Sequence, residues 1–461
     1  MQFNKMNKAH IKAFQSMVDP DRFSIGESNL ELHSKDMSHH EPCRPEAVIW
    51  PVNKAEVSGI LAYADKHLIP ITGWGAGSSL EGNPIPAKKG LVLDFTRMNK
   101  ILNIREEDFQ ADVEPGVIYK ELNKKLRHKG LFFAPDPGAG ATIGGMIANN
   151  ASGTKTVRYG STKDNILRLI VVSANGEIIT VGNRAAKTSS GYDLVHLFVG
   201  SEGTLGIIVE ATVRLAGLPA EFSAVIVAFP SVEVAGRAVF QIIRSGLDPA
   251  ALELLDPGAI ELINREKGLG LKVSPTIFME YHGPDKDQLT RVIDMVRDIC
   301  EEEGCDEFSS GLGREERDRF FEARHELGEM IMRSHPGRSH IAFDVAVPIT
   351  AYPEMIAISR EERDKSGLPG YIFGHAGDGN IHLSFMGKTG DKTDWSIIGK
   401  ANDRIVSKAL AVGGTATGEH GVGIGKRKFM DAEHGKSLEW MKKIKYLLDP
   451  NGILNPGKIF P

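Results

Sequence analysis

Cysteine is scarce in this chain, and the spacing of the few that occur excludes the chemistries that depend on several thiolates. The 461 residues include three cysteines, Cys43, Cys300 and Cys305, and no CxxC pair. Three thiolates are too few to ligate an iron–sulfur cluster, and they define no disulfide framework. We therefore expect reduced cysteines, as in a cytosolic protein.

An excess of positive charge and long apolar runs are also missing. The formal net charge is -5, in a chain that is 41% hydrophobic and 25% charged, so nothing favours nucleic acid or an anionic membrane as the main partner. No run of about 18 apolar residues could span a membrane, and residues 1–15 lack the apolar core of a signal peptide. A cytoplasmic protein without a transmembrane segment is the simplest expectation, and the length predicts two or three domains.

The fingerprints of NAD-binding and ATP-binding proteins fail when they are tested by position. The dinucleotide motif requires G-x-G-x-x-G, but counting from Gly73 places Ser78 where the third glycine should be. The phosphate loop requires a glycine five residues before Gly-Lys-Ser/Thr, and the two candidates have His382 and Met430 there. NAD and ATP are therefore disfavoured as primary cofactors.

Glycine is plentiful, with 50 residues, and it gathers in three stretches. These are GWGAGSSLEGN (73–83), PDPGAGATIGGMIANNASGTKTVRYG (135–160) and GSEGTLGIIVE (200–210). Small residues in a turn leave backbone N–H groups able to bind a pyrophosphate, and they let the backbone approach a flat ligand closely. The first stretch alone is equally compatible with a plain tight turn, whereas three stretches together favour a nucleotide-type cofactor.

Hydrophobic periodicity and turn signals predict a chain of three consecutive parts. In the first part we expect a helix over 57–68, strands at 68–71 and 91–95, a helix over 119–128, and a hairpin around residues 175 and 176. The pattern changes at residue 217, and the expected strands are then 222–229, 275–282, 339–347 and 371–385, the last folded back on itself. Helices between them, beginning near residues 231, 285, 314 and 352, favour an antiparallel sheet with helices on one face. A further helix is expected over 394–412.

The stretch FGHAGDGNIHLSF (373–385) predicts a histidine pair at a tight turn. Asp378-Gly379 is a favoured dipeptide for a two-residue type I′ turn, and folding about it would place His375 directly opposite His382. Opposed residues have Cβ atoms about 4.5–5.5 Å apart on one face, and two imidazoles at that spacing can share one divalent metal. The alternative is a pair of partly buried polar side chains without a ligand.

The stretch TGEHGVGIG (417–425) offers a second pair of chemically useful side chains. Glu419 can supply an oxygen ligand, and His420 follows it directly. Neighbouring residues in an extended loop point apart, so one can bind a metal while the other faces a substrate. A histidine is a natural general base for an alcohol proton near pH 7. A flexible surface loop is the alternative interpretation.

The three glycine-rich stretches resemble the FAD-binding domain of the vanillyl-alcohol oxidase superfamily. The resemblance implies an α+β fold, with a two-subdomain FAD-binding domain of that type and an α+β cap domain built on an antiparallel sheet. It implies three segments: 1–218 for the FAD-binding domain, 219–414 for the cap, and 415–461 completing the FAD domain. Many members attach FAD through a histidine near the first loop, and none lies between Ile69 and Pro86, so we expect non-covalent FAD. The cofactor-binding residues that the resemblance implies are Gly73, Trp74, Gly75, Ala76, Gly77, Ser78, Ser79, Pro135, Gly138, Ala141, Thr142, Gly144, Gly145, Ala151, Ser152, Gly153, Tyr159, Gly160, Glu202, Gly203, Gly206, Ile207, Ile208 and Asn455.

From about Pro45 onward the chain is similar to the family of D-lactate dehydrogenase (cytochrome), D-2-hydroxyglutarate dehydrogenase and the glycolate oxidase flavin subunit. The similarity rests on GSEGTLG, HAGDGNIH, TGEHGVG and the ending NPGKIF, in that order. It implies a divalent metal, Zn, Mn or Fe, on His375, His382 and Glu419. It also implies that His420 is the base and that Arg324 binds the substrate carboxylate, for which a planar guanidinium is suited. The active site is expected between the FAD domain and the cap.

The implied reaction is oxidation of a small D-2-hydroxy acid, D-lactate first among them, with hydride transfer to flavin N5. Electrons then pass to an external acceptor: a cytochrome, a quinone, an electron-transfer flavoprotein or a partner subunit. The flavin subunit of a glycolate oxidase complex is the nearest alternative, and an alditol oxidase or a non-catalytic flavin-binding subunit is more distant. Gly328 stands where lactate-type relatives carry a bulky residue, so longer 2-hydroxy acids stay open. The oligomeric state stays open too, a homodimer included.

Overall fold

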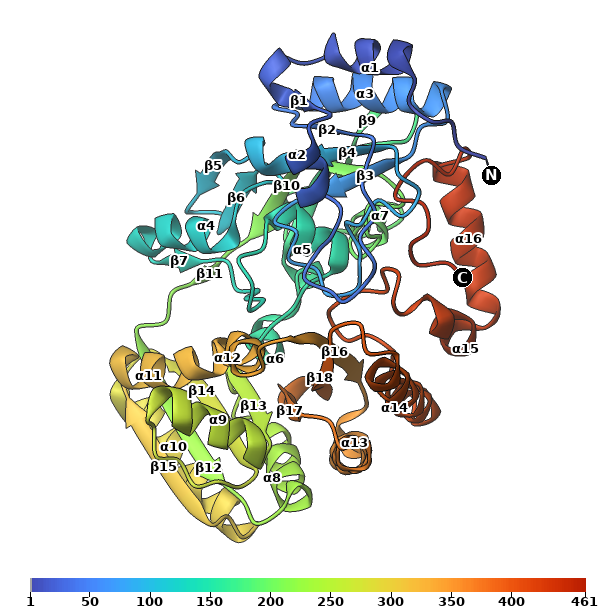
Figure 1. Ribbon diagram of the computed structural model, residues 1–461. Helices are drawn as coiled ribbons and strands as arrows, with labels where there is room; N and C mark the ends of the chain where they lie inside the picture. Colours follow the sequence, from blue (N-terminus) through green and yellow to red (C-terminus); the bar gives the residue numbers. More distant parts are fainter. Residues whose placement is uncertain (1) are drawn as a thin grey trace. The chain divides into compact units, whose positions relative to one another are not determined.

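The computed structural model describes residues 2–461, which form two compact units (Figure 1). Unit 1 comprises the chain up to Ser152 together with 160–218 and 419–461, and unit 2 comprises 153–159 and 219–418. The expected cap ended at residue 414, whereas residues 415–418 belong to unit 2. The reason is hydrogen bonding, because Thr415 N donates to Ala346 O (2.8 Å) and Gly418 N to Asp344 O (3.2 Å).

Unit 1 contains a four-stranded sheet in the order β1-β2-β4-β3. Its strands are β1 (Phe23–Ser24), β2 (Ala47–Ile49), β4 (Leu91–Asp94) and β3 (Ile71–Trp74), and the last three are parallel. Helices α1 (Lys8–Gln15), α2 (Glu27–Leu32) and α3 (Lys54–Lys66) accompany them. The predicted helix over 57–68 and strand at 91–95 are confirmed. The strand predicted at 68–71 is wrong, because Leu68 adopts a left-handed φ of 52° after α3 and pairing with β4 begins only at Ile71.

The second sheet of unit 1 is antiparallel and five-stranded, in the order β5-β6-β10-β8-β9. The strands are β5 (Ile101–Arg105), β6 (Gln110–Val113), β10 (Ile207–Arg214), β8 (Ile166–Val172) and β9 (Ile178–Gly182). The predicted hairpin at residues 175 and 176 is confirmed by β8 and β9, and Gly176 has a φ of 88°. The predicted helix over 119–128 is confirmed by α4 (Tyr119–Leu126) and one further 3-10 turn.

Both faces of the five-stranded sheet are packed with apolar side chains. One face shares a core with residues of α1 and α3, and the other with residues of α4, α5 (Ile143–Asn149) and α7 (Leu194–Phe198). The short strands β7 (Leu131–Phe132) and β11 (Ala216–Gly217) pair with each other. The C-terminal part contributes α15 (Met430–His434) and α16 (Lys436–Leu448), whose Ile444 and Leu448 pack on the second core.

Unit 2 is built on a seven-stranded antiparallel sheet in the order β15-β12-β14-β13-β17-β18-β16. The strands predicted at 222–229, 275–282, 339–347 and 371–385 are confirmed by β12 (Glu221–Ala228), β14 (Thr276–Gly283), β16 (Arg338–Ala346), and β17 (Gly370–His375) with β18 (Asn380–Lys388). Two strands were not predicted, β13 (Ala251–Leu255) and β15 (Glu307–Leu312). β13 (ALELL) consists only of Ala, Leu and Glu, which favour helices, whereas the equally buried β14 contains β-branched and aromatic residues.

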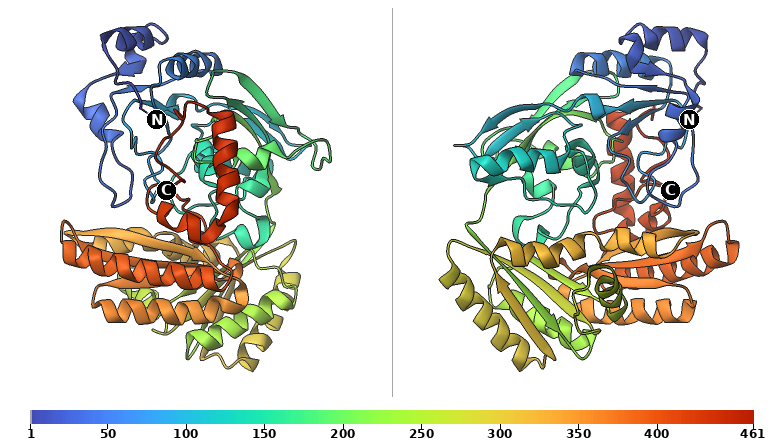
Figure 2. Two further views of the ribbon diagram at one scale, coloured as in Figure 1. Left: turned by 90° about the vertical axis from the view of Figure 1, so that its right-hand side faces the viewer. Right: turned by 60° about the vertical axis from the view of Figure 1, so that its left-hand side comes forward.

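Helices cover both faces of this sheet rather than the one face that we expected (Figure 2). One layer consists of α8 (Val232–Arg244), α10 (Lys286–Glu302), α13 (Tyr352–Ser366) and α14 (Lys392–Ala411), and the other of α9 (Pro257–Lys267), α11 (Arg314–His325) and α12 (Leu327–Ser334). The physical reason is visible in the central strand β14, where all eight residues are buried. A strand whose side chains are buried on both faces must be covered on both faces. Among residues 2–461, no helix is long and apolar enough to cross a membrane.

The turn between β17 and β18 corrects the expected register of the two histidines. A 3-10 turn over residues 376–378 and Gly379, at φ 70°, replace the two-residue turn. A side chain at residue 379 would clash with Val347 O, at 2.0 Å. His382 therefore lies opposite Phe373, not His375. The register differs from the expected one by two residues, and because side chains alternate with period two, both histidines still share one face.

Candidate active site

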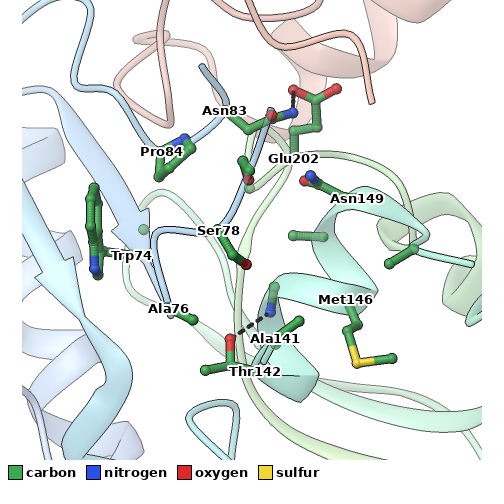
Figure 3. A pocket seen from close by; sticks show the side chains of 18 of the residues that line it. Trp74, Ala76, Ser78, Asn83, Pro84, Ala141, Thr142, Met146, Asn149 and Glu202 are labelled. Carbon is green, nitrogen blue, oxygen red and sulfur yellow. Dashed lines mark hydrogen bonds between the residues drawn. The ribbon is translucent and has the colours of Figure 1, made fainter. Parts of the chain in front are cut away.

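One cavity within unit 1 gathers the glycine-rich stretches (Figure 3). Half of the residues that line it are Gly, Ala or Ser, so its wall is largely backbone. Figure 3 shows Trp74, Ser78, Met146, Asn149 and Glu202 around this space. Among the described lining residues there is no Lys or Arg. An anionic ligand such as a pyrophosphate would therefore depend on backbone N–H groups rather than on side-chain cations.

The first loop provides those N–H groups. Residues 75–79 all line the cavity, and within residues 2–461 none of their backbone N–H groups donates a hydrogen bond. Five consecutive unused donors in a partly buried turn are costly unless water or a ligand accepts from them. The loop thus fits the diphosphate bridge of FAD.

Close packing behind the loop requires glycine at specific positions. A Cβ at Gly75 would lie 2.3 Å from Thr142 Oγ1, and one at Gly144 would lie 2.6 Å from Pro115 Cβ. Thr142 is the N-cap of α5, and its hydroxyl accepts from Gly145 N at 3.2 Å. The first and second glycine-rich stretches are therefore in direct contact, and each fixes the position of the other.

Glu202 connects the third stretch to the C-terminal segment beside the same cavity. Its buried carboxylate accepts from Asn83 Nδ2 (2.8 Å), Val422 N (2.7 Å) and Gly423 N (2.9 Å). Burial raises the pKa of Glu202, and these hydrogen bonds oppose that rise. Asn455 Nδ2 donates to the backbone oxygens of Glu202 (2.7 Å) and Asn83 (3.1 Å). Three segments distant in sequence are thus held together at one wall.

The structure places nearly all of the expected cofactor-binding residues on this cavity. The exceptions are Pro135, Gly153, Tyr159 and Gly160, which do not line it. Gly153 and Tyr159 belong to unit 2, where the Tyr159 hydroxyl is hydrogen-bonded to His282 Nδ1 at 2.7 Å. Lining residues that the sequence analysis missed are Leu80, Asn83, Pro84, Phe95, Pro115, Pro137, Ala139, Met146, Ala148 and Asn149. Most lie inside the quoted stretches or beside them, whereas Phe95 and Pro115 are brought in by the fold alone.

His420 and Glu419 line the same cavity of unit 1, together with Asn455. Ser152 Oγ donates to Glu419 Oε2 at 3.0 Å, and Asn149 Nδ2 approaches the backbone oxygen of His420 at 3.4 Å. The two side chains are only 12% and 15% exposed. A partly buried imidazole in a cavity fit for a flavin is well placed to exchange a proton with a substrate there.

The other expected ligands lie in unit 2. His375 and His382 are buried, with ring centroids 5.3 Å apart and planes at 89°, and a ring nitrogen of each lies within 4.8 Å of the other. His375 Nδ1 is 2.7 Å from Glu253 Oε1. A carboxylate partner favours the proton on Nδ1 and leaves the lone pair on Nε2, as metal-binding histidines require. These two residues fit a divalent metal.

Arg324, the expected carboxylate-binding residue, is buried on α11 in the same unit. Its Nη2 is 2.6 Å from Glu253 Oε2, and its guanidinium stacks over the Phe373 ring at 4.9 Å. Its Nε atom is buried and has no hydrogen-bond partner within residues 2–461. The sequence analysis missed Glu253, because the strand that carries it was not predicted. The structure therefore brings Arg324, His375 and His382 together in unit 2, and His420, Glu419 and Asn455 together in unit 1.

Comparison with known proteins agrees with this architecture. The model of the FAD binding domain matches residues 45–182, and that of the C-terminal domain of FAD linked oxidases matches residues 218–459. The chain is 38% identical to the probable mitochondrial D-lactate dehydrogenase of Danio rerio, covering 97% of this chain and 91% of that protein. It is 36% identical to the glycolate oxidase subunit GlcD of Bacillus subtilis, with 96% and 94% covered. The structure of p-cresol methylhydroxylase superposes with a TM-score of 0.81 at 16% identity, covering 97% and 96% of the two chains.

The fold and the cavity define an FAD-dependent oxidoreductase with the vanillyl-alcohol oxidase architecture. Within that class, the chain belongs to the FAD-linked oxidase family that contains D-lactate dehydrogenases and glycolate oxidase subunits. A mitochondrial location is part of the name of the Danio rerio relative. The cytoplasmic location expected here stays a prediction.

Proposed function

We propose that this enzyme oxidises a D-2-hydroxy acid, D-lactate first among them, to the corresponding 2-oxo acid. The observation that supports this most directly is that His420 lines the same cavity as the unpaired N–H groups of residues 75–79. A proton acceptor is thereby built into the wall of the cofactor cavity. The relatives named D-lactate dehydrogenase make lactate the first substrate to test.

Each proposed residue has one chemical task. His420 takes the hydroxyl proton of the substrate, and the guanidinium of Arg324 holds the carboxylate. The bound FAD, which we propose is held non-covalently, supplies the acceptor for the hydride that leaves C2. A divalent metal held by His375, His382 and Glu419 would lower the pKa of the hydroxyl; Zn, Mn and Fe all suit such ligands. Reoxidation of the reduced flavin requires an external electron acceptor, such as a cytochrome, a quinone, an electron-transfer flavoprotein or a partner subunit.

The side chain of the substrate is the least constrained part of the proposal. Gly328 lies at the start of α12, four residues beyond Arg324, and a Cβ there would meet nothing within 4 Å. That space favours testing 2-hydroxy acids longer than lactate. Glycolate belongs in the same test, because a relative that covers nearly the whole chain is named as a glycolate oxidase subunit.

The test is anaerobic reduction of the flavin. The purified, FAD-loaded protein is mixed with D-lactate or L-lactate, and the flavin absorbance at ~450 nm is followed. Bleaching by the D-enantiomer alone is the expected result, and it is expected to slow after metal chelation. If only glycolate or a longer D-2-hydroxy acid bleaches the flavin, that acid is the substrate and lactate is not. If no 2-hydroxy acid reduces the flavin, the proposed reaction is wrong.

A further inference from the structure

One face of the seven-stranded sheet in unit 2 carries two fully buried glutamates. They are Glu253 on β13 and Glu280 on β14, and both are 0% exposed. Glu280 pairs with Ala251 across the two strands, so the two carboxylates lie on the same face, because residues two apart along a strand share a face. A buried carboxylate is tolerated only when charged and hydrogen-bonding partners surround it. Both glutamates have such partners.

Glu253 is bound by two residues to which the proposed function gives tasks. It stands directly opposite His375 in the register of β13 and β17. One carboxylate oxygen is 2.7 Å from His375 Nδ1, and the other is 2.6 Å from Arg324 Nη2. A single carboxylate therefore connects the candidate metal ligand to the candidate substrate anchor.

Glu280 has a similar pair of partners that the proposed function does not use. Its Oε1 is 2.5 Å from His282 Nε2 and 3.0 Å from Arg317 Nε. Arg317 and Arg324 are seven residues apart on α11, so two turns of one helix supply both arginines. Residues 2–461 thus contain two Arg–Glu–His groups of similar build around a buried glutamate, and only one of them includes residues of the candidate site.

We propose that Glu253 is a positioning residue that fixes the metal-binding tautomer of His375 and the orientation of the Arg324 guanidinium at once. This inference rests on the proposed function. The carboxylate accepts the Nδ1 proton of His375 and so presents the Nε2 lone pair to the metal. It also forms an ion pair with Nη2 of Arg324 and so holds the guanidinium in one orientation. Loss of Glu253 charge should therefore impair metal binding and substrate binding together.

The test compares Glu253→Gln with the matched control Glu280→Gln in the FAD-loaded enzyme. Each variant removes one buried charge from the same sheet face and leaves one Arg–His pair without its carboxylate. Three quantities are measured: metal content across a chelator series, KM and kcat for flavin reduction, and Tm. Because removal of a carboxylate that supports a metal-binding histidine typically costs 10–100-fold in metal affinity, E253Q is expected to lose metal at about 10–100-fold lower chelator concentration. Its KM is expected to rise by at least about tenfold. E280Q is expected to lower Tm comparably, with metal affinity and KM as in the wild type.

Each outcome decides between the alternatives. Equal effects of E253Q and E280Q on metal affinity and KM, or no effect of either, would overturn the positioning role. If E253Q does not fold, the variant Glu253→Asp provides the test, because its side chain keeps the charge but is too short to reach both His375 and Arg324. E253D is then expected to lose metal affinity and substrate affinity, and wild-type values would overturn the proposal. A wild-type enzyme that binds no metal, or that no hydroxy acid reduces, would instead contradict the proposed function itself.

Discussion

The contact between Gly75 and Thr142 gives a quantitative prediction for FAD binding. A Cβ at residue 75 would lie 2.3 Å from Thr142 Oγ1, whereas its distance to Thr142 Cβ would be an ordinary 3.4 Å. Overpacking of this kind costs about 1–3 kcal/mol, which corresponds to a factor of roughly 5–150 in an equilibrium constant. The overlap can be relieved by moving the loop away from α5 or by rotating the Thr142 hydroxyl, which would remove the cap of Gly145 N. Gly75→Ala is therefore expected to weaken FAD binding by about that factor.

A second substitution isolates the cause. Thr142→Ala removes the clashing hydroxyl and also removes the cap of Gly145 N, for which we expect a loss of about 1 kcal/mol. In the double variant the overlap is gone, so its FAD affinity should match that of Thr142→Ala alone rather than the sum of the two effects. Such non-additivity is the signature of a direct contact. Gly59→Ala, in α3 with nothing within 4 Å of the new Cβ, is the control and should bind FAD as the wild type does.

The assay is titration of flavin-free protein with FAD, followed by flavin fluorescence. The reasoning is refuted if Gly75→Ala binds FAD with wild-type affinity. It is also refuted if the effects of the substitutions at residues 75 and 142 simply add, because the loss would then have a cause other than their overlap.

Three further predictions concern the flavin, the base and acid stability. Acid precipitation is expected to release FAD into the supernatant, and flavin retained in the pellet would show a covalent bond. His420→Ala should slow flavin reduction about 10²–10⁴-fold with FAD still bound, and a near-normal rate would remove His420 from the mechanism. Burial raises the pKa of Glu280, but the hydrogen bond from His282 and the charges of Lys155 and Arg317 bring it from 4.5 to about 2. Because the folded-state pKa is the lower one, this carboxylate stabilises the fold above pH 4.5, and ~3 kcal/mol is lost as pH falls toward 2. The free energy of unfolding in urea should depend less steeply on pH across that range for Glu280→Gln than for the wild type. An unchanged slope would contradict the lowered pKa of Glu280.

Local chemistry determined much of the fold. Asn175-Gly176 specifies its hairpin because a glycine accepts the positive φ that the turn requires. Ser231 and Asp285 begin α8 and α10 because each side chain accepts from a backbone N–H group in the first turn. Glycine-rich stretches likewise indicated the cofactor cavity, since few side chains remain there to fill the space. These features depend on a few neighbouring residues, which is why the sequence alone determines them.

Other features depended on contacts between distant segments. The strand β13 was not recognised, because its residues are Ala, Leu and Glu, which favour helices, and Glu253 was missed together with the strand. The sequence predicted a two-residue turn between His375 and His382. The structure has a longer turn there, a 3-10 turn followed by Gly379, whose backbone is packed against the backbone of Val347. The two histidines still lie on one face of the sheet, because a register shift of two residues leaves the direction of each side chain unchanged. The sequence by itself therefore determined the turn at Asn175-Gly176, the helix caps and the glycine-rich walls, whereas pairing between strands far apart in the chain decided which buried charges meet.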